Sequence, residues 1–238
     1  MRYSFARAML NETRAALVHM PGTALRHKIK SERPADINGL ANGLILPGFG
    51  APSPVYNDLG IYIVSAGFGV HVAEYGVGNL PNLTRQIRLL THNAKWCVQR
   101  WGRLDYVIGH SLGGLEALWL LSRYPTLKRV FAISSPITNP TRAIRWGAVL
   151  GIAPRHVQKK ILARIIRRTN GHKEKVVTIS MENDWLVPPE SGALEGAKNV
   201  VVLGDPSEHG PLQTHTAGVD SPRVREIIRQ ELEAVFGV

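Results

Sequence analysis

A G-x-S-x-G pattern at residues 109–113, followed by another glycine at 114, is the feature that most constrains the fold of this chain. The apolar run 104–108 before it predicts a strand, and the run 115–121 after it predicts a helix. Glycines two residues before and after Ser111 remove the Cβ atoms that would clash in a sharp turn between them. Such a turn presents the serine hydroxyl clear of the sheet, beside the first N–H groups of the helix. We therefore interpret Ser111 as a candidate nucleophile.

Short apolar runs alternate with helical patterns over most of the chain. The predicted strands are 39–46, 61–65, 104–108, 129–134, 176–181 and 199–203, and long helices are predicted at 83–101 and 222–236. This alternation predicts an α/β fold, a mostly parallel sheet covered by helices on both faces. The 238 residues fit a single domain over 1–238. Working groups of such sheets gather beyond the carboxyl ends of the strands.

The positive charge of the chain is concentrated in one segment. The formal net charge is +11, and Glu174 is the only acid among ten basic residues between 138 and 175. That stretch is too long for a bare crossover between strands, and helices are predicted within it at 140–150 and 154–169. We interpret 137–175 as a basic helical cap, inserted between late strands over the active site. Its basic face is a candidate contact with anionic membrane surfaces, and a solvated helix face is the alternative.

The ends and the single cysteine bear on location. Residues 1–38 are predicted to form an N-terminal helical extension, with an amphipathic helix over 3–20. It lacks the uninterrupted apolar core of a signal peptide, and no apolar run is long enough to span a bilayer. Cys97 is the only cysteine, so no intrachain disulfide can form. We expect a cytoplasmic protein, with peripheral membrane contact through the cap as a variant of that expectation.

A serine needs an adjacent base, and the base needs an orienting acid. When a serine sits on a strand-to-helix turn of this kind, the acid and then the base follow it along the chain. Glu182 and Asp184 follow the predicted strand 176–181, and His209 and His215 follow the strand 199–203. The order of residues leaves both pairs open.

At this point the chain resembles the α/β-hydrolases, and within them the small esterase and lipase branch. The resemblance covers residue 40 to the end and rests on the 109–114 motif, on Asp184 before Leu-Val-Pro, and on His209-Gly after the last strand. It implies that Ser111 is the nucleophile, Asp184 the acid and His209 the base. Asp205 is a weaker rival acid because it follows the last strand, and His215 is the rival base.

The same resemblance implies an oxyanion hole made of two backbone N–H groups. One belongs to Leu112, the residue after the nucleophile, and the other to Phe49 in the loop after the first strand. That loop reads Pro-Gly-Phe-Gly at 47–50, where the family often has His-Gly. The expected substrate-binding residues are Gly48, His110, Trp146, Leu150 and Trp185.

These residues predict a serine carboxylic-ester hydrolase that acts on apolar acyl esters of small molecules or lipids. An acyltransferase, thioesterase or amidase with the same triad is the alternative, and a non-catalytic module that binds membranes or polyanions is a further one. We expect no metal and no cofactor, because the nine histidines show no ligand spacing and the 67–69 glycines do not continue into a nucleotide-binding pattern. Basic residues without interleaved aromatics disfavour nucleic acid as a partner. The sequence does not predict an oligomeric state.

Overall fold

The protein is described here by a computed structural model that places residues 38–75, 83–138, 155–204 and 215–238. Within these ranges, six parallel strands form one sheet in the order β2-β1-β3-β4-β5-β6. The strands are β1 (Asn42–Leu46), β2 (Gly69–Val72), β3 (Tyr106–His110), β4 (Arg129–Ile133), β5 (Val176–Met181) and β6 (Lys198–Val202). This arrangement confirms the predicted α/β class and the mostly parallel sheet.

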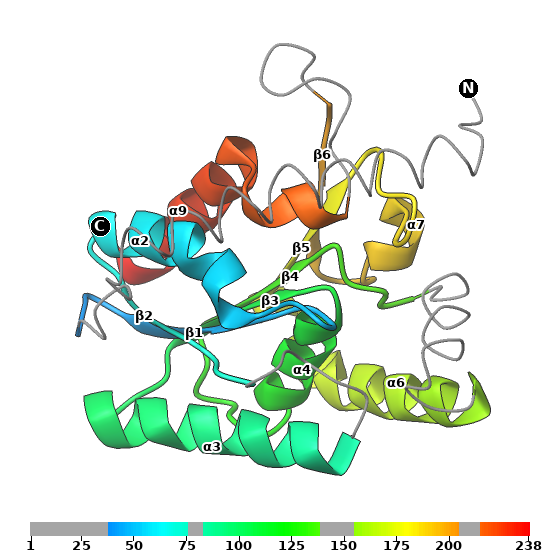
Figure 1. Ribbon diagram of the computed structural model, residues 1–238, viewed down its shortest axis with the longest axis horizontal. Helices are drawn as coiled ribbons and strands as arrows, with labels where there is room; N and C mark the ends of the chain where they lie inside the picture. The colour runs from blue at the N-terminus through cyan, green and yellow to red at the C-terminus, as the bar shows by residue number, and fades with distance from the viewer. Residues whose placement is uncertain (1–37, 76–82, 139–154, 205–214) are drawn as a thin grey trace.

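Helices cover both faces of the sheet (Figure 1). On one face lie α2 (Asn57–Ser65) and α9 (Pro222–Phe236), and on the other lie α3 (Leu83–Trp101), α4 (Leu112–Leu121) and α6 (Arg155–Thr169). The shorter helices are η1 (Ser53–Tyr56), η2 (Asn170–Lys175), α7 (Pro189–Gly192) and η3 (Thr216–Val219). The predicted helices 83–101 and 222–236 are confirmed. No helix in the described ranges is long and apolar enough to cross a membrane.

Side chains of the central strands alternate between two apolar cores. In β3, Val107 packs with residues of α3 and α4, whereas Tyr106 and Ile108 pack with residues of α2 and α9. All three are almost fully buried. Strands buried on both faces read as continuous apolar runs, which is why this part of the chain was predictable from its composition.

The predicted strand over 61–65 is wrong, because these residues form the end of α2. Ile63 lies on the buried side of that helix together with Leu59, whereas Ile61 is largely exposed. The second strand is β2 instead. Gly67, with φ of 88°, turns the chain out of α2 and into this edge strand. A four-residue edge strand that contains a histidine gives too little apolar signal to be recognised.

The predicted basic cap is described only in part. The predicted helix 154–169 is confirmed as α6, which packs Ile165 into the core on the face that carries α4. This part of the segment 137–175 therefore acts as a crossover helix between β4 and β5. A cap over the active site remains a prediction for 139–154, which lies outside the described residues, as does nearly all of the predicted extension 1–38.

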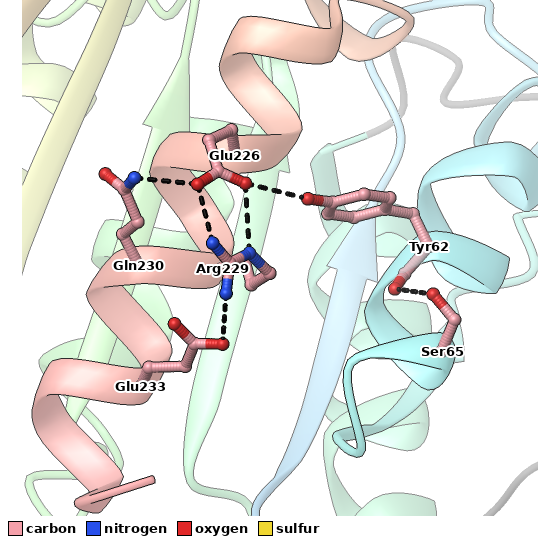
Figure 2. Close-up of polar contacts among 6 residues, drawn as sticks. All are labelled: Tyr62, Ser65, Glu226, Arg229, Gln230 and Glu233. Carbon is pink, nitrogen blue, oxygen red and sulfur yellow. Dashed lines mark hydrogen bonds and ion pairs between the residues drawn. The ribbon is translucent and has the colours of Figure 1, made fainter.

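A cluster of polar contacts joins α9 to α2 (Figure 2). Glu226 accepts hydrogen bonds from Arg229 at 2.6 and 2.9 Å, from Gln230 at 2.7 Å and from the Tyr62 hydroxyl of α2 at 3.1 Å. Arg229 also contacts Glu233 at 2.5 Å. The hydrogen bonds from Arg229 lower the pKa of Glu226 to about 2.

Replacing Glu226 by Gln is expected to lower the melting temperature slightly at neutral pH. A carboxylate whose pKa is lower in the folded than in the unfolded state stabilises the fold above pH 4.5, and that stabilisation is lost as the pH falls toward 2. The difference in melting temperature between wild type and variant should therefore narrow over this range and shrink in high salt, since the cluster is partly exposed to solvent. Glu195→Gln, at an exposed carboxylate elsewhere, is the control for thermal scans. Equal changes in melting temperature for Glu226→Gln and Glu195→Gln, at every pH, would contradict the expectation.

Candidate active site

Ser111 sits on the turn between β3 and α4, at the carboxyl edge of the sheet. Its backbone has φ of 54° and ψ of −116°, a conformation that is strained for a residue with a side chain. Its N–H donates to the carbonyl oxygen of Ile133 in β4 at 2.8 Å. The strained backbone of Ser111 is thus stabilised by its position between β3 and α4 and by its hydrogen bond to β4. The sharp turn at Ser111 is the one that the sequence motif predicts.

The glycines of the motif are required by close packing of backbones. A Cβ atom on Gly109 would lie 2.2 Å from the carbonyl oxygen of Gly113, and one on Gly113 would lie 2.2 Å from the carbonyl oxygen of Leu46. The start of α4 is therefore in direct contact with the ends of β3 and β1. This contact carries the serine and the loop after β1 to the same place.

Asp184 lies in the turn after β5 and is almost fully buried. Its Oδ1 accepts a hydrogen bond from the N–H of Val187 at 2.7 Å, and its Oδ2 lies 2.9 Å from Nδ1 of His215. The rival acid Glu182 is exposed, and its Oε2 accepts from the N–H of Gly204 instead. The structure therefore brings Asp184, and not Glu182, to the histidine.

His215, the rival base, lies between Ser111 and Asp184, where the resemblance implied His209. Nε2 of His215 lies 2.8 Å from Oγ of Ser111, and Nδ1 faces Asp184. His209 and the rival acid Asp205 lie outside the described residues. The preference for His209 followed nearness to the strand end, whereas the position of His215 is set by the helix after it. Gly218 of η3 packs on Ile133 of β4 and Met181 of β5. This contact holds His215, the residue before η3, near the carboxyl ends of these strands.

The three side chains have one consistent arrangement of protons. A carboxylate only accepts hydrogen bonds, so Nδ1 of His215 carries the proton that is donated to Asp184. In neutral imidazole, Nε2 is then the acceptor, and the hydroxyl of Ser111 donates to it. This geometry allows the imidazole to remove the serine proton as the oxygen attacks.

Leu112 and the loop that carries Phe49 lie near the serine. Leu112 is the first residue of α4, where backbone N–H groups have no partner within the helix. Gly48 is buried in the loop after β1, and a Cβ atom on it would lie 3.3 Å from Cβ of Ser111. Phe49 follows it and is half-buried. The loop is thus close enough to the serine for its backbone to face a bound acyl group.

The other expected substrate-binding residues have different positions. His110 is buried, and its Nε2–H donates to the backbone oxygen of His215 at 2.9 Å, so it lies behind the base instead of lining the site. Trp185 is half-buried next to Asp184. Trp146 and Leu150 lie outside the described residues. No group of three metal-ligating side chains occurs in the described ranges.

The pKa of His110 is lowered to about 4, mainly by burial and to a smaller extent by the nearby His215 ring, while the hydrogen bond to the His215 backbone and the charges of Asp184 and Asp220 act in the opposite direction. The unfolded chain therefore binds more protons than the folded one between pH 6.5 and 4. We expect the free energy of unfolding of wild type to fall as the pH drops through this range, and that of His110→Gln to fall less. Denaturant titrations at several pH values measure both slopes, and parallel slopes would contradict the assignment.

Comparison with known proteins gives a family match and a set of similar folds. Residues 91–185 match the model of the family described as "Putative esterase". The search of curated proteins found no match.

Among solved structures, the monoacylglycerol lipase of Paleococcus ferrophilus is 16% identical, with a TM-score of 0.57, and covers 84% of this chain and 95% of its own. Est1E of Butyrivibrio proteoclasticus is 15% identical, with a TM-score of 0.61 and coverage of 86% and 91%. The thioesterase domain from the curacin biosynthetic pathway is 12% identical, with a TM-score of 0.54 and coverage of 84% and 92%. At these identities the likeness is one of fold.

Proposed function

Since this chain has the α/β-hydrolase fold, we propose that it is a serine carboxylic-ester hydrolase whose triad is Ser111, His215 and Asp184. The single observation that carries this proposal is the row of two hydrogen bonds through His215, from Ser111 on one side to Asp184 on the other. The match of residues 91–185 to an esterase family and the esterases and lipases among the structural neighbours support the same activity.

The proposed reaction has two stages. Oγ of Ser111 attacks the acyl carbonyl while Nε2 of His215 takes its proton, and the imidazolium then protonates the leaving alcohol. Water then attacks the acyl-enzyme, giving its proton to His215, and the acid is released as the serine regains a proton. Asp184 stabilises the imidazolium in both stages. The N–H groups of Leu112 and Phe49 are the proposed donors to the oxyanion.

The proposed substrates are apolar acyl esters of small molecules or lipids. The lipase and esterase neighbours favour this class. A transfer to an acceptor other than water, or cleavage of a thioester or amide, uses the same triad, and the thioesterase neighbour keeps that alternative open. Trp146 and Leu150, which are expected to line the acyl site, lie outside the described residues. A series of esters of increasing acyl length measures the preferred chain length.

The test is hydrolysis of p-nitrophenyl esters from acetate to palmitate, together with labelling by a fluorophosphonate. We expect turnover with a distinct chain-length optimum, and labelling of Ser111 that is absent from Ser111→Ala. Thioester and amide analogues of the best chain length, with and without an acceptor alcohol, distinguish the alternatives. A wild-type protein that is folded, yet neither turns over any ester nor reacts with the fluorophosphonate, would overturn the proposal.

A peripheral contact with anionic membranes is proposed for the exposed face of α6. Among the side chains of α6 that the structure describes, the exposed charged ones are Lys160, Arg164, Arg167 and Arg168, and the sequence of α6 contains no acidic residue. Such a face attracts anionic headgroups within a Debye length. Binding to vesicles that contain phosphatidylserine should be lost in high salt and in Arg164→Gln/Arg167→Gln/Arg168→Gln. Equal binding of the variant and wild type would exclude α6 as the contact.

A further inference from the structure

Behind the triad, a buried row of hydrogen bonds connects the loop after β1 to the backbone of the proposed base. We propose that Tyr56 and His110 are positioning residues, which hold the oxyanion loop and His215 in register with Ser111. This inference rests on the proposed function, because it assigns a role within the same site. It concerns two residues outside the proposed triad, whose hydrogen bonds run to Gly48, to each other and to the backbone of His215.

Three hydrogen bonds form the row. The N–H of Gly48 donates to the hydroxyl oxygen of Tyr56 at 2.7 Å, that oxygen lies 2.9 Å from Nδ1 of His110, and Nε2 of His110 lies 2.9 Å from the carbonyl oxygen of His215. Gly48, Tyr56 and His110 are all buried. The row therefore joins three segments that are far apart in the sequence and that each deliver one part of the site.

The protons of this row can be assigned from its two ends. The carbonyl of His215 can only accept, so Nε2 of His110 carries a proton. Burial lowers the pKa of His110 to about 4, so its ring is neutral at working pH and Nδ1 is an acceptor. The Tyr56 hydroxyl donates to Nδ1 and accepts from Gly48, and burial raises the pKa of that hydroxyl. Every donor meets an acceptor, in one direction along the row.

Close packing leaves little freedom around the row. A Cβ atom on Gly48 would lie 2.9 Å from Nδ1 of His110 and 3.3 Å from the Tyr56 hydroxyl oxygen. The His110 ring centroid lies 5.1 Å from that of His215 and 6.0 Å from that of Tyr56. A shift of the loop after β1 is thus transmitted through His110 to the backbone of His215. The role we assign is to keep the distance between oxyanion donor and base constant.

A device of this kind affects the transition state more than substrate binding. The base and the oxyanion donors are needed most as charge develops on the acyl oxygen, so their misplacement lowers kcat. Replacing a residue that only stabilises the fold would lower the melting temperature without a selective loss of kcat. The measurement must therefore separate kcat from KM and from the melting temperature.

The test compares Tyr56→Phe with Tyr106→Phe. Both substitutions remove one buried hydroxyl, and the Tyr106 hydroxyl donates to the backbone oxygen of Gly69, outside the site. We expect both variants to lose some stability, but only Tyr56→Phe to lose about tenfold in kcat and in the rate of fluorophosphonate labelling, with KM nearly unchanged. Equal kcat in wild type, Tyr56→Phe and Tyr106→Phe would overturn the inference.

Two substitutions of His110 test the other end of the row. The amide N–H of His110→Gln can replace the Nε2–H donor to His215, whereas His110→Leu offers no donor. We expect His110→Gln to retain more of kcat than His110→Leu, at comparable melting temperatures. Equal losses of kcat in His110→Gln and His110→Leu would show that the hydrogen bond from His110 to the backbone of His215 does not support catalysis, which would overturn this part of the proposal. A wild-type protein without turnover or labelling would instead overturn the proposed function, before any of these variants is compared.

Discussion

His215→Ala is expected to lower kcat for ester hydrolysis by about 10⁴- to 10⁶-fold, whereas His209→Ala keeps kcat near that of wild type. The physical reason is contact: Nε2 of His215 lies 2.8 Å from Oγ of Ser111 and Nδ1 lies 2.9 Å from Asp184. Without an imidazole there, the serine hydroxyl has no base to take its proton. Steady-state kinetics on the best p-nitrophenyl ester measures kcat of both variants, and reaction with a fluorophosphonate measures the rate at which Ser111 is labelled.

The two histidines are suited to a direct comparison because they lie six residues apart in one segment. Melting temperatures of both variants control for folding, since His215 is buried in the site. Activity that survives in His215→Ala and disappears in His209→Ala would reverse the assignment. Full activity in both His215→Ala and His209→Ala would contradict the proposed triad.

The choice between these histidines marks the limit of what local sequence can predict. Ser111 and its glycines are defined by contacts within a few residues. The structure has a strand, a turn and a helix there as predicted, although the strand lies at Tyr106–His110 instead of 104–108 and the helix begins at Leu112 instead of 115. The position of His215 depends on η3 packing across β4 and β5, which is a contact between segments far apart in the chain. The local pattern favours His209, which is nearer the strand end and followed by glycine.

Tyr56 shows the same limit from the other side. It lies in η1, and nothing in the run around it indicates a role in the site. Its hydroxyl becomes important because β1 and β3 are neighbours in the sheet, which places the loop after β1 beside His110. Strands with strong apolar signal were therefore predictable, whereas the short edge strand β2 and the residues proposed to support the triad could be found only from the fold.

Gly109→Ala is expected to destabilise the protein by about 3 kcal/mol and to abolish esterase activity with it. The added Cβ atom would lie 2.2 Å from the carbonyl oxygen of Gly113, 2.4 Å from its carbonyl carbon and 2.5 Å from the backbone nitrogen of Gly114. All three are backbone atoms at the start of α4, so no side-chain rotation can relieve the clash. The helix must move away from β3, which carries Ser111 and Leu112 out of place.

Gly171→Ala is the matched control, because a Cβ atom on Gly171 meets no atom within 4 Å. Chemical denaturation of wild type and both variants measures the free energy of unfolding, and kinetics on the same preparations measures activity. Since α4 both anchors the sheet and carries the turn, stability and kcat should fall together in Gly109→Ala and stay unchanged in Gly171→Ala. A Gly109→Ala protein of wild-type stability and activity would contradict this expectation. It would mean that the space between Gly109 and the carbonyl oxygen of Gly113 is larger than the 2.2 Å given for an added Cβ atom, so that close packing of α4 on β3 would not account for the strained backbone of Ser111.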